Sequence, residues 1–286
     1  MRATKTLRQL LATNKIVVAP GCFDGLSARL TEQAGFPALY ASGGAIARSA
    51  GVPDLGLLAL GEIVARLENI VDVVGIPVIA DADTGYGSAL NVQRAVRAFE
   101  RAGIAALHLE DQTFPKKCGH YDDKGVVPAA EMIGKLKAAR DALHDDDFIV
   151  IARTDAIAVE GLERALDRAA AYVEAGADMI FVEAPQSEAQ IAEIARRLPG
   201  PKLINMFHGG KTPLLPVARL EALGYSVVII PSDTQRATIT AIQRVLACIR
   251  RDGSSAAMLD DLASFKDREG VVATGDYIAR DKAYAP

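Results

Sequence analysis

The acidic run Asp81-Ala82-Asp83 is the first feature of the sequence that could do chemistry. Residues two apart on a strand point to the same side, so both carboxylates would face one way. Paired carboxylates repel each other, and a hard divalent cation such as Mg²⁺ relieves that repulsion. Two helix N-caps or loop aspartates would give the same short pattern. A third acidic residue, Glu110, follows another apolar run and favours the metal site.

A second group of reactive residues is the segment Lys116-Lys117-Cys118-Gly119-His120. Two lysines and a histidine favour a thiolate, or a thiol poised to give up its proton. The glycine permits a ligand to approach closely. The alternative is a solvated basic loop with an incidental cysteine. A Cys–His pair also suggests a protease-type nucleophile, but the neighbouring carboxylates favour an acid/base role for Cys118.

Two further polar residues adjoin apolar runs. Arg153 follows one run, and its guanidinium could bind a substrate carboxylate or phosphonate through two hydrogen bonds. The alternative is a structural ion pair with Asp155 or Glu183, and both interpretations stay open. His108 lies within an apolar run and is interpreted as a core histidine with its hydrogen bonds satisfied.

Eight short apolar runs alternate with longer amphipathic stretches and would position these residues. This alternation predicts a parallel sheet, and eight repeats predict an α/β fold of the (β/α)₈ TIM-barrel type. Active sites of such barrels lie at the carboxyl ends of the strands, where most of these polar residues stand. The long segment 111–127 after the fourth run is predicted to be a functional loop. The runs are Ile16–Ala19, Ala38–Ala41, Pro77–Ala80, Ala106–Leu109, Phe148–Ala152, Met179–Val182, Lys202–Asn205 and Ser226–Ile230.

The composition limits the classes of protein that fit. A net charge of −4 over 286 residues argues against a general nucleic-acid binder. Three cysteines do not form a disulfide framework, and no long uncharged apolar stretch or signal-peptide region is evident, so a cytoplasmic location is predicted. The alternation of apolar runs and amphipathic stretches ends near residue 251. We expect a barrel over 1–251 and a C-terminal helical tail over 252–286 that packs on a neighbouring subunit.

Several segments together resemble the isocitrate lyase/phosphoenolpyruvate mutase superfamily, in order over roughly residues 5 to 250. The loop Lys116–His120 is the most specific of them. It resembles the carbon–carbon lyase branch, with its 2-methylisocitrate lyase and 2,3-dimethylmalate lyase (petal-death) types, although a carboxyphosphonoenolpyruvate mutase branch also carries it. The segments are Tyr40–Gly44, Gly51–Gly56, Asp81–Gly87, Glu110–Gln112, Lys116–His120, Ala152–Ala156, Val182–Ala184 and Gly209–Pro213.

The resemblance implies a (β/α)₈ enzyme that uses Mg²⁺, with Mn²⁺ as a substitute. Asp81 and Asp83 would hold the metal, with Glu110 and Asp54 in its outer shell through water. In the lyases the C2–C3 bond of a 2-hydroxy acid breaks, and the loop cysteine protonates the departing enediolate. The catalytic residues would be Cys118, Tyr40, Arg153 and His120. The substrate-binding residues would be Ser42, Gly43, Gly44, Asp54, Gly119, Glu183, Asn205 and His208.

The resemblance also has consequences for assembly and substrate. The family is usually a dimer of dimers with a swapped C-terminal helix, so the tail implies a homotetramer. One departure concerns His208, because close lyase relatives usually carry glutamate before the Gly209-Gly210 pair. The segment Pro231-Ser232-Asp233 also differs from the Pro-Leu-Ser often seen there. Both departures leave the exact substrate undetermined.

Three activities follow from these residues. The first is a Mg²⁺-dependent carbon–carbon lyase acting on a 2-hydroxy di- or tricarboxylate of the 2-methylisocitrate or 2-alkylmalate type. The second is a carboxyphosphonoenolpyruvate-type phosphonomutase, and the third is an oxaloacetate decarboxylase or hydrolase. Cys118 favours the first, because the mutase has less obvious need of a proton donor. The general base is not identified.

Overall fold

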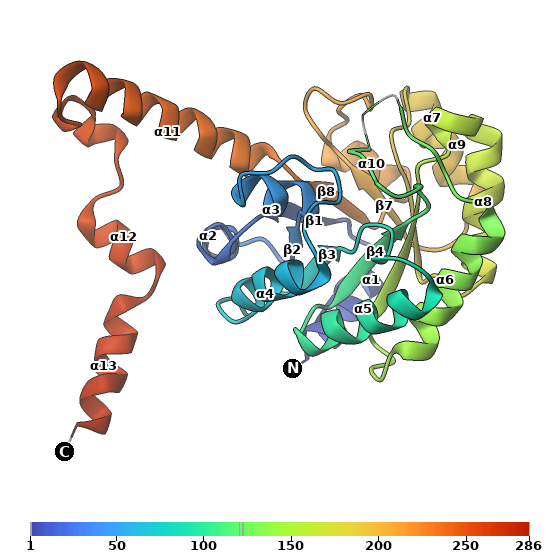
Figure 1. Ribbon diagram of the computed structural model, residues 1–286, viewed down its shortest axis with the longest axis horizontal. Coiled ribbons are helices and arrows are strands. Elements are labelled where there is room, and N and C mark those ends of the chain that lie inside the picture. Colours follow the sequence, from blue (N-terminus) through green and yellow to red (C-terminus); the bar gives the residue numbers. More distant parts are fainter. Residues whose placement is uncertain (1, 120, 122, 286) are drawn as a thin grey trace.

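Eight parallel strands close into a barrel in the order β1 to β8 (Figure 1). The structure is a computed structural model that describes residues 2–119, 121 and 123–285. The (β/α)₈ prediction is therefore confirmed, and each strand coincides with one of the eight apolar runs. The strands are β1 (Val17–Cys22), β2 (Leu39–Ala41), β3 (Val78–Asp81), β4 (Ala106–Glu110), β5 (Ile149–Thr154), β6 (Met179–Val182), β7 (Lys202–Asn205) and β8 (Val227–Ile230).

Helices cover the outside of the barrel between successive strands (Figure 1). Their apolar faces pack on the outward residues of the strands in a cluster that includes Leu67, Phe99 and Tyr172. The helices of the barrel are α1 (Ala3–Ala12), α2 (Gly25–Gln33), α3 (Gly43–Ser49), α4 (Leu60–Val71), α5 (Ala89–Arg101), α6 (Ala129–Ala142), α7 (Ile157–Glu160), α8 (Leu162–Glu174), α9 (Glu188–Arg197) and α10 (Val217–Ala222).

Alternation along the strands decides which side chains point into the barrel. Ile79 and Ile151 belong to the inner core, whereas Val78 and Val150 pack outward against helices. Asp81 stands two residues after Ile79 and Arg153 two residues after Ile151, so both continue the inward-facing set. The inner core thus ends in charged groups at the carboxyl ends of the strands.

The same alternation corrects the prediction for Asp83. Strand β3 ends at Asp81, and the chain then turns, with Asp83 in the left-handed region at φ 47°. The two aspartates therefore do not share one face of a strand, because the strand does not reach the second of them. They are brought together by a turn, in which the Asp83 backbone N–H donates to Asp81 Oδ1 at 3.0 Å.

A C-terminal extension leaves the barrel as helix α11 (Asp233–Asp252) and continues away from it (Figure 1). It contains the 3₁₀ turn η1 (Ala256–Asp261) and helices α12 (Phe265–Val271) and α13 (Thr274–Tyr284). The predicted helical extension is confirmed. Among the described residues, no helix is long and apolar enough to cross a membrane.

Candidate active site

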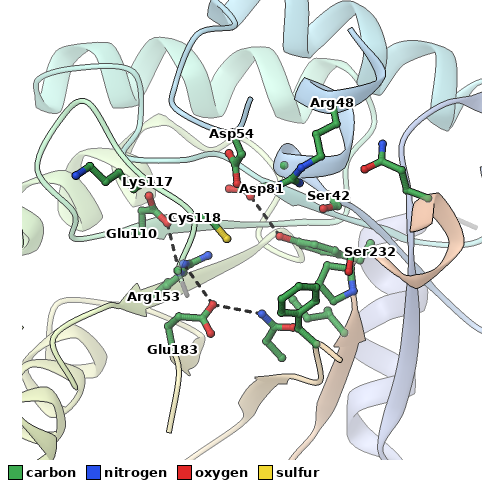
Figure 2. A pocket seen from close by; sticks show the side chains of 18 of the residues that line it. Ser42, Arg48, Asp54, Asp81, Glu110, Lys117, Cys118, Arg153, Glu183 and Ser232 are labelled. Atoms are coloured by element: carbon green, nitrogen blue, oxygen red, sulfur yellow. Dashed lines mark hydrogen bonds and ion pairs between the residues drawn. The ribbon is translucent and has the colours of Figure 1, made fainter. Parts of the chain in front are cut away.

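A pocket opens at the carboxyl ends of the strands and collects most of the predicted site residues (Figure 2). Asp83, Gly43 and His208 are outside its lining, and His120 lies outside the described residues. A Cβ on Gly43 would stand 2.7 Å from Asp81 Oδ2, so this glycine packs directly beneath the pocket. The predicted residues that line it are Tyr40, Ser42, Gly44, Asp54, Asp81, Glu110, Cys118, Gly119, Arg153, Glu183 and Asn205.

Asp81 occupies the centre of a buried polar cluster. Tyr40 Oη lies 3.4 Å from its Oδ2, and His108 Nε2 lies 3.7 Å from its Oδ1. Burial opposes ionisation, but the charges of His108, Lys116 and Arg153 outweigh it and lower the pKa of Asp81 to about 2. Burial lowers the pKa of His108 itself to about 4. His108 is therefore neutral at pH 7, and Lys116 and Arg153 then provide the positive charge that keeps Asp81 ionised.

Lys116 links the second aspartate to Asp54. Its ammonium lies 2.7 Å from Asp83 Oδ1 and also contacts Asp54 Oδ1. Burial raises the pKa of Asp83, and Lys116 only partly offsets this, so that with the charge of Asp81 the pKa reaches about 6. Burial acts in the opposite direction on Lys116, but the surrounding carboxylates raise its pKa well above the usual value.

The donor set at this rim suits a hard divalent cation. Glu110 Oε1 is buried without a hydrogen-bond partner, beside the ionised Asp81. Burial raises the pKa of Glu110 well above its usual value, so a cation nearby would favour its ionised form. Within the described part of the chain, no three His, Cys, Asp or Glu side chains converge in a ready-made metal cluster. The fit therefore rests on the oxygen chemistry and on the unpaired Glu110 atom.

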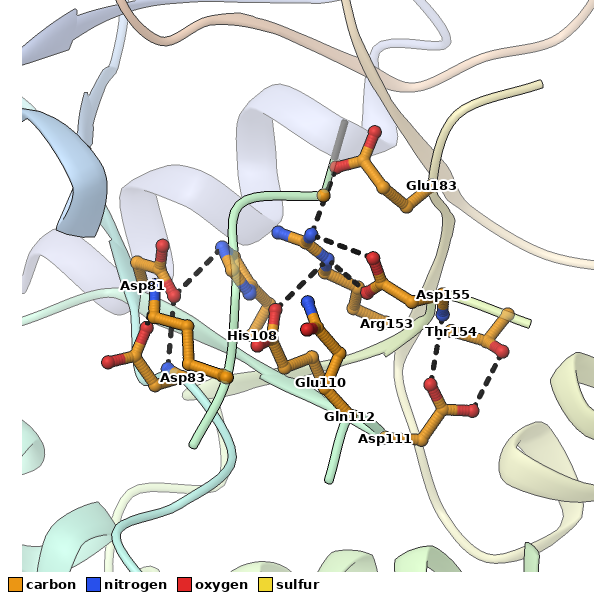
Figure 3. A network of polar contacts seen from close by, with 12 residues as sticks. Asp81, Asp83, His108, Glu110, Asp111, Gln112, Arg153, Thr154, Asp155 and Glu183 are labelled. Carbon is orange, nitrogen blue, oxygen red and sulfur yellow. Dashed lines mark hydrogen bonds and ion pairs between the residues drawn. The ribbon is translucent and has the colours of Figure 1, made fainter. Parts of the chain in front are cut away.

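Arg153 makes the structural ion pairs that one of its two interpretations predicted, and it also lines the pocket. Its Nε lies 2.9 Å from Asp155 Oδ2 and 3.3 Å from Glu110 Oε2, and its Nη2 lies 3.3 Å from Glu183 Oε2 (Figure 3). It also stacks on Phe181, with the guanidinium carbon 5.1 Å from the ring centroid. Ion pairs thus fix the orientation of Arg153, while the same side chain lines the pocket.

Cys118 enters the pocket from the loop after β4. It lines the pocket together with Asp81 and Arg153 (Figure 2), and the residue is half-buried. The next residue has to be glycine, because a Cβ on Gly119 would collide with the side chains of Arg153 and Glu183. The loop backbone therefore approaches the arginine as closely as the chain permits.

The outer wall of the pocket consists of residues that were not predicted from the sequence. Arg48 comes from α3, Phe207 follows β7, and Gln235, Arg236 and Ile239 come from α11. These side chains belong mainly to helices, whereas polar residues at strand ends are what a barrel sequence marks as site residues. The signal that could have found Arg236 is its position at the start of the helix after β8. Lys117, which was predicted only as a charge near Cys118, also lines the pocket.

Known proteins with similar sequences and structures place this site in a family. The family model described as phosphoenolpyruvate phosphomutase matches residues 7–250. The chain is 45% identical to a 2,3-dimethylmalate lyase of Eubacterium barkeri over 93% of each chain. It is 46% identical to a 2-methylisocitrate lyase of Aeropyrum pernix, over 96% of this chain and 89% of the relative.

A solved structure of phosphonopyruvate hydrolase in complex with oxalate and Mg²⁺ is also similar. It matches with a TM-score of 0.91 and 34% identity over 99% of each chain. The chain therefore belongs to the phosphoenolpyruvate mutase/isocitrate lyase superfamily. Within that superfamily it is a carbon–carbon lyase.

Proposed function

We propose that this lyase cleaves the C2–C3 bond of a 2-hydroxy di- or tricarboxylate, of the 2-methylisocitrate or 2-alkylmalate type. The products would be pyruvate, or a related oxo acid, and a carboxylic acid. The observation that carries the proposal is that Cys118 lines the same pocket as the ionised Asp81 and the guanidinium of Arg153. A thiol that can donate a proton thus shares the pocket with a carboxylate that could bind a metal and a cation that could bind an anion.

The cation of the site would be Mg²⁺, with Mn²⁺ as a substitute. Asp81 and Asp83 would hold it, with Glu110 and Asp54 in the outer shell, and the unpaired Glu110 oxygen supports this set. When bound, the metal supplies Lewis-acid stabilisation of the charge that develops on the substrate oxygen. The similarity to a hydrolase that binds Mg²⁺ supports the choice of ion.

The oxo-acid half of the substrate would bind at the inner end of the pocket. Ser42 caps α3, and Gly43 and Gly44 begin that helix, so backbone N–H groups there suit a carboxylate. Tyr40 and Asn205 line the same inner region as hydrogen-bonding groups. Arg153, with Glu183 behind it, would hold the carboxylate next to the bond that breaks. His120 would assist from the cysteine loop.

The chemical step breaks one carbon–carbon bond and transfers two protons. A general base, which is not identified, takes the 2-hydroxyl proton, the electron pair left on that oxygen forms the C2 carbonyl, and the C2–C3 pair stays on C3 as an enediolate. The Cys118 thiol then donates its proton to C3 and becomes a thiolate. The closed loop around Cys118 would exclude water from the enediolate until this transfer is complete.

The loss of the general acid provides the main test. We expect Cys118→Ser to lower pyruvate release by about 10²–10⁴, the usual contribution of a positioned acid or base. Mg²⁺ binding, measured by calorimetry, should survive. Cys248, a buried cysteine on α11 away from the pocket, gives the matched control Cys248→Ser, which should keep its activity. Undiminished release by Cys118→Ser would contradict the acid role.

The outer wall of the pocket favours a departing fragment with an additional carboxylate. Arg48 and Arg236 belong to this wall, and Arg236 is held by a 2.8 Å hydrogen bond to the His208 carbonyl. Cleavage of 2-methylisocitrate releases a dicarboxylate, whereas 2,3-dimethylmalate releases a monocarboxylate. The two arginines of the outer wall suit the dicarboxylate product.

Substitution of Arg236 tests this substrate preference. Arg236→Gln should lower kcat/KM for 2-methylisocitrate about tenfold more than for 2,3-dimethylmalate, because a charge-assisted hydrogen bond is lost. The control Arg244→Gln alters an arginine on the same helix that pairs with Asp261. An equal loss on both substrates would contradict the preference. A phosphonate substrate, followed by phosphorus NMR, tests the phosphonomutase alternative, and oxaloacetate tests the decarboxylase or hydrolase.

The assembly and location would follow the family expectation. We infer a homotetramer, a dimer of dimers, in which the tail 252–286 packs on a neighbouring subunit and is swapped with it. The exposed apolar side chains Leu246, Phe265 and Ile278 on the extension support this packing. The cytoplasm would be the site of action.

A further inference from the structure

Lys124 is a buried cation on the same loop as the acid Cys118. Its side chain is 0% exposed, and its Nζ lies 2.6 Å from Asp155 Oδ1, which is also 0% exposed. The same ammonium donates to the Gly119 carbonyl oxygen. A buried ammonium is costly unless it is paired and hydrogen-bonded. These two acceptors therefore determine where Lys124, and with it the loop, comes to rest.

Asp155 holds Lys124 and the substrate arginine at the same time. Arg153 donates from Nε to Asp155 Oδ2 at 2.9 Å and from Nη2 to Oδ1 at 3.2 Å (Figure 3). Asp155 is itself held in place, because its backbone N–H donates to Asp111 Oδ1 at 2.9 Å. Asp111 is held in turn by Thr154 and Tyr172. One rigid carboxylate thus defines the position of both cations.

Gly119 connects this arrangement to the acid. Its carbonyl accepts from Lys124, and its α-carbon packs against Arg153 and Glu183 without room for a Cβ. Cys118 is the preceding residue, so the distance from its sulfur to Arg153 depends on where Gly119 rests. Without Lys124, steric contact with Arg153 would remain, but no charge would draw the loop toward Asp155.

We propose that Lys124 is a positioning residue that locks the Cys118 loop onto Arg153 through their shared partner Asp155. Proton delivery to the enediolate then requires Lys124, although Lys124 touches neither substrate nor metal. Substrate binding depends on it much less, because Arg153 keeps Asp155, Glu110 and Glu183 as partners. The inference rests on the proposed acid role of Cys118.

The test combines kinetics with hydrogen exchange on the full-length enzyme. Lys124→Met should lower kcat at least tenfold on the preferred substrate and change KM less than threefold. Backbone amides of residues 113–119 should exchange faster in the absence of substrate. Lys124→Arg keeps the cation and should show smaller losses of both kinds. The matched control is Lys202→Met, since Lys202 is a buried lysine that donates to the Leu198 and Gly200 carbonyls at the start of β7.

The outcomes separate this proposal from the acid role. Lys124→Met with kcat and exchange both within twofold of the wild type would overturn the lock. So would an equal change in Lys202→Met, because the effect would then be general to buried lysines. If Lys124→Met does not fold, Lys124→Gln, which can still donate one hydrogen bond, is judged by the same two criteria. Full turnover by Cys118→Ser would remove the acid role, whereas the exchange measurement would still decide the lock.

Discussion

At the scale of single residues, the buried pair beneath Asp81 shows how the site sets its charges. His108 is fully buried, and its Nε2 lies 2.8 Å from Tyr40 Oη. Its burial confirms the interpretation of His108 as a core histidine, but the expectation that its hydrogen bonds are satisfied is wrong in part, because Nδ1 is buried without a partner. Its neutral ring lies between the barrel core, where it meets Phe181 edge to face, and the ionised Asp81.

The buried histidine predicts a pH dependence of stability. Burial lowers the pKa of His108 to about 4, below the 6.5 of an unfolded histidine. Between these values the unfolded chain binds a proton that the folded chain does not, so stability falls as pH drops from about 6.5 to about 4. At pH about 5.5 the loss from His108 alone should be about 1.2 kcal/mol relative to neutral pH.

Urea unfolding at several pH values checks this expectation. The lowered pKa of Asp81, about 2, costs stability only below the unfolded value of 3.8. The raised pKa of Asp83, about 6, acts in the same pH window as His108 but with the opposite sign, so the contribution of His108 is read from the difference between variants. His108→Gln should flatten the slope between pH about 7 and about 5, whereas His144→Gln should keep it, since His144 is outside the core. An unchanged slope in His108→Gln would assign the dependence to another group.

At the scale of elements, strand register builds the site. Strands β4 and β5 pair from Ala106 opposite Ile149 to Glu110 opposite Arg153. Glu110 and Arg153 therefore stand side by side at the ends of these strands. The sequence predicted both residues at strand ends, because apolar runs mark the strands and barrels place their active sites there. It could not predict the turn at Asp83 or the pairing of Lys124 with Asp155. Those depend on backbone dihedrals and on contacts between distant segments, which no local pattern encodes.

Glu110, at the end of β4, pairs with Arg153 and is proposed to lie in the outer shell of the metal. We expect Glu110→Gln to raise the Mg²⁺ concentration for half-maximal activity at least about tenfold, since partners in the outer shell of a metal typically contribute 10–100-fold in affinity. Calorimetric titration with Mg²⁺ should show the same weakening. Glu131→Gln on α6, whose side chain is 51% exposed, is the control and should leave both unchanged. Equal Mg²⁺ requirements in the two variants would remove Glu110 from the metal shell.

At the scale of the whole molecule, the barrel and its extension differ in how far their apolar side chains are buried. The barrel covers its own apolar residues with helices, whereas α11 exposes Ile242 by 53% and Leu246 by 59%. Phe265 on the extension is 73% exposed. The extension meets the barrel at few points, one being a 3.1 Å hydrogen bond from Gln33 on α2 to the Val271 carbonyl. Apolar surface of this kind usually marks an interface with another chain.

Substitutions on α11 test whether a second copy covers this surface. We expect the wild-type protein to run at a multiple of its 30.2 kDa chain mass in size-exclusion chromatography with light scattering. Ile242→Glu with Leu246→Glu should shift it toward smaller species, because two charges would enter an apolar interface. Arg250→Glu, an exposed position on the same helix, changes charge without removing apolar area and should keep the oligomer. A wild-type monomer would contradict the assembly outright. An unchanged oligomer in the double variant would show that the interface between subunits does not include this face of α11. A second copy of the chain would then not cover the apolar face of the extension.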